Sequence, residues 1–170
     1  MSVSDAPIVD GALKPMTIDV PLEQLPPIDE HAIEVDAPAE VAWDALFPTL
    51  QHTLDRPRVR RYAERIDAAV TVARGDLRHP GGMLPGFTVI RAIQPVMLAL
   101  AGRHRHAQYA MVFRIDLLPG QRSRVRLESR AQFIGRRGRF YRAGVIGTRG
   151  HVLFVNRMLR AVKRRAEAGG

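Results

Sequence analysis

A strand that runs directly into an amphipathic helix is the first pair of elements that the hydrophobic pattern predicts. Ile33 and Val35 alternate with more polar neighbours, which is the period-two pattern of a half-buried strand, and we place this strand at 30–36. Pro38 suits the first turn of a helix, and apolar residues at helical spacing extend that helix over 38–47. We therefore expect the first strand to be followed at once by a helix that buries one face.

Two prolines delimit the segment after this helix. Pro48 is expected to end or kink the helix, because proline lacks the N–H that an interior helical position needs. Residues 49–56 then form a second short turn of helix before Pro57. The pattern thus predicts two short helices after the first strand.

The middle of the chain is rich in alternating segments that predict strands. The two clearest ones are joined by Pro119 and Gly120, a pair typical of a hairpin turn. Apolar residues share one face of each strand, and in 123–134 arginine, glutamate and glutamine occupy the other face, so we expect an antiparallel sheet with one face in water. A loop at 78–86 with two prolines and three glycines separates the first of these strands from the rest. The predicted strands lie at 68–73, 87–93, 96–100, 107–118 and 123–134.

The period changes to that of a helix from Arg139 to Ala168. Apolar residues three or four apart form one broad stripe, and most of the arginines lie elsewhere on the helix. A helix with such a stripe needs an apolar partner, and the inner face of the sheet is the obvious one.

Length and composition fit one globular domain preceded by an arm. The chain has 170 residues, of which 46% are apolar and 25% charged. Five prolines and no sustained period mark residues 1–28 as an extended acidic arm, and we assign 29–168 to one domain. The absence of cysteine excludes disulfides, thiolate metal sites and cysteine nucleophiles.

No export or membrane-spanning segment is expected. The first residues lack the basic leader and apolar core of a secretory signal, and the longest apolar run, 96–101, is too short to cross a bilayer. We therefore expect a cytoplasmic protein. No histidine spacing fits a zinc site, so we expect neither a metal nor another cofactor.

The net charge of +9 is unevenly distributed along the chain. Residues 1–55 carry eleven acidic side chains and one basic one, whereas 56–170 carry twenty-five basic and six acidic ones. The acidic part can neutralise the basic part within the fold, the arginines can form a surface for a phosphate-rich partner, or they can simply keep the protein soluble. The sequence leaves these three interpretations open.

The segment AIEVDAPAEVAWDAL closely resembles the opening of the START-like (SRPBCC) superfamily, which includes polyketide cyclases, aromatases and proteins of the birch-pollen allergen type. In that superfamily a strand with the pattern I-x-V-x-A-P-x-E-x-V-W leads into the first helix, although the aromatic residue lies one step nearer here than in some members. The closing stretch of the chain is similar in length, basicity and pattern to the last helix of the superfamily. The matching positions of the opening are Ile33, Val35, Ala37, Pro38, Glu40 and Trp43.

This resemblance implies an α+β helix-grip fold. A curved antiparallel sheet would wrap around a long C-terminal helix, with two short helices after the first strand. Members of the superfamily hold an apolar or amphipathic molecule in a cavity between sheet and helix. The resemblance therefore implies a hydrophobic or lipid-like small molecule as partner, and it leaves the oligomeric state open.

The implied cavity would be lined by residues on the inward faces of the predicted strands and helix. The alternative is that the same residues are ordinary packed core. The candidate ligand-binding residues are Phe87, Val89, Tyr109, Met111, Phe113, Leu127, Phe133, His151, Val152, Phe154 and Met158.

Candidate chemistry is sparse. His151 falls near the apolar stripe of the last helix and is the histidine best placed to point into a cavity, although a core histidine is usually just hydrogen-bonded. Some relatives catalyse cyclisation with arginine, tyrosine or histidine in the pocket, parts that Arg91, Tyr109 and His151 could take by resemblance. No catalytic residue is assigned, and binding without catalysis is favoured.

Two basic glycine-containing segments suggest a binding site for an anion. Arg136, Arg137 and Arg139 lie at the predicted start of the last helix, where free N–H groups also favour a phosphate or carboxylate. The pattern GxxG at 135–138 and within 145–153 also occurs in the loop with which KH modules clamp nucleic-acid backbones. A KH module needs a further strand after the following helix, and the end of this chain is helical, so we do not expect a KH module and do not favour nucleic acid as the partner.

Three functions remain open from the sequence. The first is binding, or carriage, of a hydrophobic or amphipathic small molecule. The second is an enzyme of the cyclase or aromatase type. The third is a basic adaptor, whose arginines on the last helix would make weak, salt-sensitive contact with an anionic membrane surface or with nucleic acid.

Overall fold

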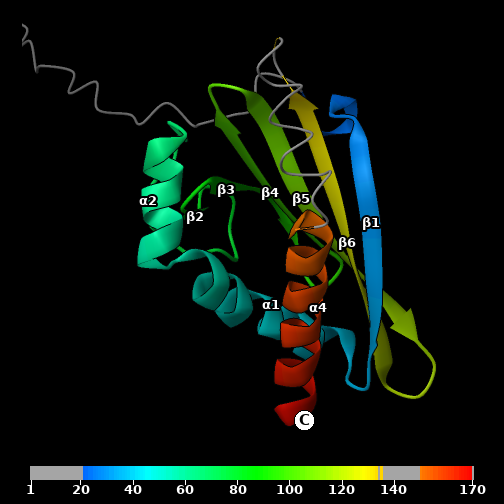
Figure 1. Ribbon diagram of the computed structural model, residues 1–170. Helices are drawn as coiled ribbons and strands as arrows, with labels where there is room; N and C mark the ends of the chain where they lie inside the picture. The colour runs from blue at the N-terminus through cyan, green and yellow to red at the C-terminus, as the bar shows by residue number, and fades with distance from the viewer. Residues whose placement is uncertain (1–20, 134, 136–149, 170) are drawn as a thin grey trace, which may run out of the picture.

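A curved antiparallel sheet and a long helix packed on its inner face organise the computed structural model, which describes residues 21–133, 135 and 150–169 (Figure 1). Within the described residues the sheet has six strands in the order β1-β6-β5-β4-β3-β2. The first strand therefore pairs with the last one, with Ile33 opposite Val125. The strands are β1 (Pro27–Val35), β2 (Met83–Leu84), β3 (Phe87–Ile93), β4 (Met97–His104), β5 (Ala107–Leu118) and β6 (Arg122–Phe133).

The described helices are η1 (Leu22–Gln24), α1 (Ala39–Leu54), α2 (Pro57–Arg65) and α4 (Gly150–Ala168). Helix α4 lies against α1, β1 and β6, and its apolar stripe is buried there. Trp43 of α1 is buried in the same core and makes an edge-to-face contact with Phe47, with 5.3 Å between ring centroids. These features confirm the predicted helix-grip fold. The first eleven residues of the predicted last helix, 139–149, lie outside the described residues.

A second, smaller apolar cluster covers the other face of the sheet. Leu22 and Leu25 of the segment before β1 are buried there against Met97, Ala99 and Val112. Residues 1–20 of the predicted arm lie outside the described residues. The part of the arm next to the domain thus packs on the sheet.

Charged side chains form cross-strand pairs along β1, β5 and β6. Arg122 and Arg124 of β6 both contact the carboxylate of Glu34 on β1, at 2.8 and 2.9 Å. Arg126 reaches Asp116 of β5 at 2.8 Å. Acidic side chains of the first strand therefore neutralise part of the basic sheet.

Pro48 does not end the first helix, which corrects one prediction. Helix α1 continues through Pro48 to Leu54. The proline removes one helical hydrogen bond to the carbonyl of Asp44, and both residues lie on the exposed side, where water can satisfy that oxygen. Burial of Leu50 and Leu54 on the opposite side stabilises the continuous helix. The second helix consequently begins only at Pro57.

The predicted strand at 68–73 is also wrong. Two isolated backbone hydrogen bonds tie this segment to its surroundings, from Ala69 N–H to Arg103 O and from Gly86 N–H to Val70 O. A ladder of strand pairs does not form, because the neighbouring edge strand β2 has only two residues. Directly after this segment, Arg74 forms a single isolated β-bridge with Met83.

Candidate functional site

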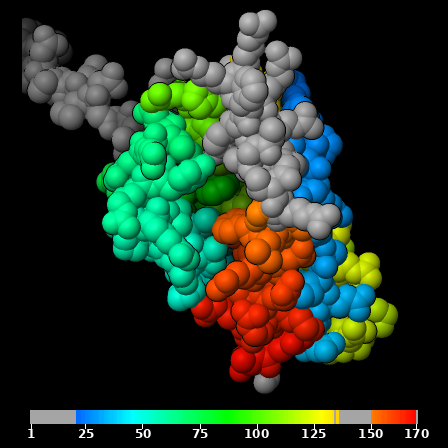
Figure 2. Space-filling view, in the orientation of Figure 1, coloured from blue at the N-terminus to red at the C-terminus, as the bar shows by residue number. Residues whose placement is uncertain are grey.

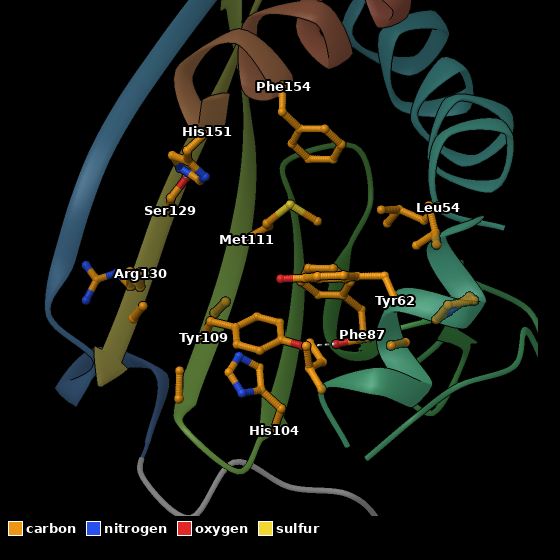
Figure 3. A pocket seen from close by; sticks show the side chains of 18 of the residues that line it. Leu54, Tyr62, Phe87, His104, Tyr109, Met111, Ser129, Arg130, His151 and Phe154 are labelled. Atoms are coloured by element: carbon orange, nitrogen blue, oxygen red, sulfur yellow. Dashed lines mark hydrogen bonds between the residues drawn. The ribbon is translucent and has the colours of Figure 1, made fainter. Parts of the chain in front are cut away.

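A cavity of about 460 Å³ lies between the inner face of the sheet, helix α2 and the first turn of α4. Figure 2 shows it as a hollow between α2 and α4, with residues of the sheet visible at its floor. Most of its wall is apolar, polar side chains cluster at two places on it (Figure 3), and Arg58 of α2 also lines it. A concave, mainly apolar cavity with few polar groups is the usual form of a small-molecule site.

Six of the predicted ligand-binding residues line this cavity. They come from strands β3, β5 and β6 and from the first turns of α4, so segments far apart in the sequence meet here. They are Phe87, Tyr109, Met111, Phe133, His151 and Phe154.

The other five predicted residues lie elsewhere. Val89, Phe113, Leu127 and Met158 are buried in the main core, and Val152 is half-buried outside the cavity wall. The inward stripe runs the full length of each strand, but α1 and α4 fill the space over one end of the sheet and leave the cavity over the other. The predicted anion-binding residues Arg136, Arg137 and Arg139 lie outside the described residues.

Helix α2 supplies a wall that the sequence analysis did not predict. Val59, Tyr62 and Ala63 face the cavity from α2, and Ile66 follows directly after the helix. These four positions follow the spacing i, i+3, i+4, i+7 of one helix face. This helical spacing could have predicted an inward face for the segment. Five arginines between positions 56 and 65 make the same segment strongly polar, and the face was therefore missed.

Tyr109 anchors an aromatic corner of the cavity. Its hydroxyl donates a hydrogen bond of 2.9 Å to the carbonyl oxygen of Gly86, and its ring meets Phe87 edge-to-face at 5.2 Å. Burial, with a smaller effect of nearby Tyr62, raises the pKa of Tyr109 far above its ordinary value. Tyr109 therefore keeps its proton at neutral pH and acts as a hydrogen-bond donor.

Removal of this hydroxyl tests the anchor. Tyr109→Phe keeps the ring but leaves Gly86 O without its tyrosine donor, and we expect the free energy of unfolding to fall by about 1–2 kcal/mol. Urea denaturation monitored by circular dichroism measures the change. A variant as stable as the wild type would show that the hydroxyl does not hold the Gly86 loop.

His104 stands beside Tyr109 in the same corner. The two rings are 5.6 Å apart, and His104 Nδ1 accepts a hydrogen bond of 3.2 Å from the backbone N–H of His106. Burial, together with the charge of His106, lowers the pKa of His104 below its ordinary value. The imidazole is therefore neutral at pH 7, with Nδ1 as its acceptor.

The lowered pKa of His104 predicts a pH dependence of stability. Below about pH 6.5 the unfolded chain takes up a proton at this site more readily than the folded chain, so the free energy of unfolding falls as the pH drops toward the lower folded-state pKa. We expect His104→Gln to flatten this part of the profile. Urea denaturation at intervals between about pH 7.5 and about pH 5 gives the slope, and an unchanged slope in the variant would contradict the assignment.

The second polar place of the wall joins three elements. His151 Nε2 of α4 lies 3.0 Å from Ser129 Oγ of β6 and 3.3 Å from Asp29 Oδ1 of β1. His31 Nε2 approaches the other carboxylate oxygen of Asp29 at 3.2 Å. Partial burial raises the pKa of Asp29, but hydrogen bonding with Ser129 and the two histidines, together with the charge of His151, outweighs it and leaves the pKa below its ordinary value.

This Asp–His–Ser cluster is not a catalytic triad of the kind found in serine hydrolases. In such a triad the carboxylate and the hydroxyl are hydrogen-bonded to opposite nitrogens of the imidazole. Here both Asp29 and Ser129 meet Nε2 of His151. The cluster can orient His151 and offer a polar contact or a proton to a molecule in the cavity.

Two arginines near the site point away from it. Arg91, a candidate from resemblance, is exposed and lies 3.5 Å from Glu23 on the other side of the sheet. Arg130 borders the cavity, but its guanidinium contacts Glu128 and the carbonyl of Leu25, and Figure 3 shows it directed outward. Neither arginine supplies charge inside the cavity.

The described residues contain no group of three histidines, aspartates or glutamates arranged to hold a metal ion. Among the helices that the structure describes, none combines the length and the apolar character needed to cross a membrane.

Comparison with solved structures gives the class of fold. The chain is similar to the Zhui aromatase/cyclase from Streptomyces sp. R1128, with 18% identity, a TM-score of 0.50 and coverage of 84% of this chain and 96% of that one. It is also similar to protein CV1439 from Chromobacterium violaceum, with 9% identity, a TM-score of 0.51 and coverage of 82% and 99%. No protein-family model and no curated protein sequence matches the chain. The predicted resemblance to START-like proteins is thus confirmed at the level of the helix-grip fold.

Proposed function

We propose that this protein binds a hydrophobic or amphipathic small molecule in the cavity between the sheet, α2 and α4. The observation that supports this function is the cavity of about 460 Å³, which remains open beside a densely filled core. Protein interiors normally pack without such voids, so a large apolar one is typical of a binding site.

The distribution of polar groups favours an amphipathic ligand. Phe87, Met111 and Phe154 offer an apolar surface for its body. The cluster around His151 lies on one side of this surface and Tyr109 with His104 on another (Figure 3). A polar head group would be oriented by one of these two places, because a buried polar group needs a hydrogen-bond partner.

Native mass spectrometry of freshly purified protein, followed by solvent extraction, tests this function. We expect a reproducible added mass that releases a lipid-like or other apolar molecule on extraction. An unloaded protein that also fails to take up fatty acids, phospholipids or the neutral fluorescent probe N-phenyl-1-naphthylamine would contradict the proposal.

Cyclisation of a flexible polyketone inside the cavity is the second candidate function. Two polar pairs on the wall favour it, Ser129 with His151 and His104 with Tyr109. The fold is also that of the aromatase/cyclase named above. In an aldol cyclisation His151 would remove a proton from a methylene carbon, and this carbon would attack a carbonyl carbon of the same chain. The alkoxide formed would then take the proton back from the imidazolium of His151, which restores the neutral base.

A synthetic poly-β-ketone thioester tests this second function. The expected product retains the carbon skeleton and has lost one water after ring closure and dehydration. His151→Ala should slow its formation, whereas His79→Ala, far along the chain in an exposed loop, should not. Equal rates with and without protein would leave binding as the function.

A further inference from the structure

Helix α2 presents a strongly basic surface beside the cavity. All nine of its residues are described, and Ala63 alone among them is buried. Arg60 pairs with Asp55. In contrast, no ion pair or side-chain hydrogen bond in the described part of the chain engages the guanidinium groups of the three other arginines. These are Arg58, Arg61 and Arg65, and all three are exposed.

Exposed apolar side chains occur on the two helices that flank the hollow. Tyr62 of α2 is 48% exposed and Phe154 of α4 is 37% exposed, and both also line the cavity. Leu153, beside Phe154 in the sequence, is 65% exposed. Figure 2 shows α2 and the first turns of α4 flanking the hollow on one face of the molecule. The two helices beside the hollow therefore carry exposed arginines and exposed apolar side chains.

We propose that this face docks on an anionic phospholipid membrane. The docking rim consists of Arg58, Arg61, Tyr62, Arg65, Leu153 and Phe154. Its arginines would contact lipid phosphates, and its apolar side chains would enter the interface between head groups and acyl chains. The docking rests on the exposed rim alone and is independent of the proposed ligand binding.

The balance of charge on the rim supports an anionic partner. Glu64 is the acidic residue of α2, against three exposed arginines without a partner in the described residues. Asp67, just after the helix, lies 3.7 Å from Arg105, which offsets its charge. The rim thus keeps a net positive charge.

The apolar side chains favour a membrane over nucleic acid. A nucleic-acid backbone would satisfy the arginines equally well. It would leave Leu153 in water, since an aliphatic side chain neither stacks like an aromatic ring nor pairs with phosphate. In a membrane interface Leu153 and Phe154 gain the free energy of leaving water.

Vesicle co-sedimentation tests the arginine part of the rim. The wild type should bind vesicles of equal parts phosphatidylglycerol and phosphatidylcholine at near-physiological salt, and hardly bind phosphatidylcholine alone. The triple variant R58Q/R61Q/R65Q should bind the anionic vesicles about 100-fold more weakly, at about a factor of five per arginine.

A matched triple variant controls for overall charge. R160Q/R164Q/R165Q removes the same charge from exposed positions at the other end of α4. We expect it to change vesicle binding by less than about threefold, because the screening length at this salt is only about 8 Å. If both triple variants lost vesicle binding equally, the proposed docking rim would be wrong. Such a result would indicate that the net positive charge of the whole protein attracts the vesicles.

A pair of leucine substitutions tests the apolar part. Leu153→Ser should weaken binding to anionic vesicles about tenfold, from the loss of an apolar side chain in the interface. Leu117→Ser, at the far end of β5 and also exposed, should leave it unchanged. Circular dichroism spectra and melting temperatures of all variants show that each one is folded.

Two further outcomes would overturn the proposal. One is a wild type that does not bind anionic vesicles. The other is equal binding of the wild type and Leu153→Ser together with tighter binding of a short RNA or DNA duplex, which would assign the arginines to nucleic acid.

Discussion

Ala131→Trp is expected to close the cavity and to weaken binding of N-phenyl-1-naphthylamine about 100-fold. Ala131 lies on β6 opposite Tyr109 of β5, and its side chain is on the cavity wall. An indole at this position projects into the space that a ligand would occupy. It displaces no core side chain, so the melting temperature should stay within a few degrees of the wild-type value. Fluorescence titration measures the affinity.

Gln132→Trp is the matched control for this variant. Gln132 is the next residue of β6, and its exposed side chain lies on the opposite face of the sheet. The same large side chain there should leave the affinity within about twofold. Unchanged affinity in Ala131→Trp, with a folded protein, would show that the probe binds outside the cavity.

Gly102→Ala is expected to lower the free energy of unfolding by about 3 kcal/mol. Gly102 lies on β4 beneath the ring of Tyr109. A Cβ atom at this position would overlap the carbonyl oxygen of Gly86 and lie 2.8 Å from Cε2 of Tyr109. Gly86 belongs to a turn that also accepts the Tyr109 hydrogen bond, so relief of the overlap moves backbone and breaks this contact. Urea denaturation measures the loss.

The same variant should also disturb the cavity, because Gly86 and Tyr109 both line it. Gly169→Ala is the control substitution, since a Cβ atom there meets only an ordinary contact of 3.6 Å. We expect it to change stability by less than about 0.5 kcal/mol. A Gly102→Ala variant with wild-type stability would show that the β3–β4 region accommodates the added methyl group.

The local patterns of the sequence predicted most strands correctly, for a clear reason. In β6 buried side chains alternate with partly exposed ones, so the residues themselves show the period of two. In β5 the outer face is also covered, by the second apolar cluster, but the side chains of the inner face still recur at every second position. The segment 68–73 has the same alternation and is not a strand. It lacks a neighbouring strand in register, and no property of its own residues reveals that.

The candidate site was predicted in part for a related reason. Inward-facing positions can be identified on each strand, and Phe87, Tyr109 and Met111 were identified in this way. Phe113 and Leu127 face the same side but are covered by helices. Whether an inward residue meets a helix or a cavity depends on where the helices lie along the sheet, which a strand pattern does not contain.

The sequence by itself thus determined the opening strand and helix, the inward faces of the long strands and of the last helix, and the class of fold, because these follow from local periodicity and from the strand–helix opening around Pro38. Only the tertiary structure decided where the cavity lies and what surrounds it. It placed α2 as an exposed wall, and it brought Asp29, Ser129 and His151 together from three separate elements. The cavity and this cluster both depend on how the elements pack against one another. That packing is determined by the whole chain and not by the pattern of any one segment.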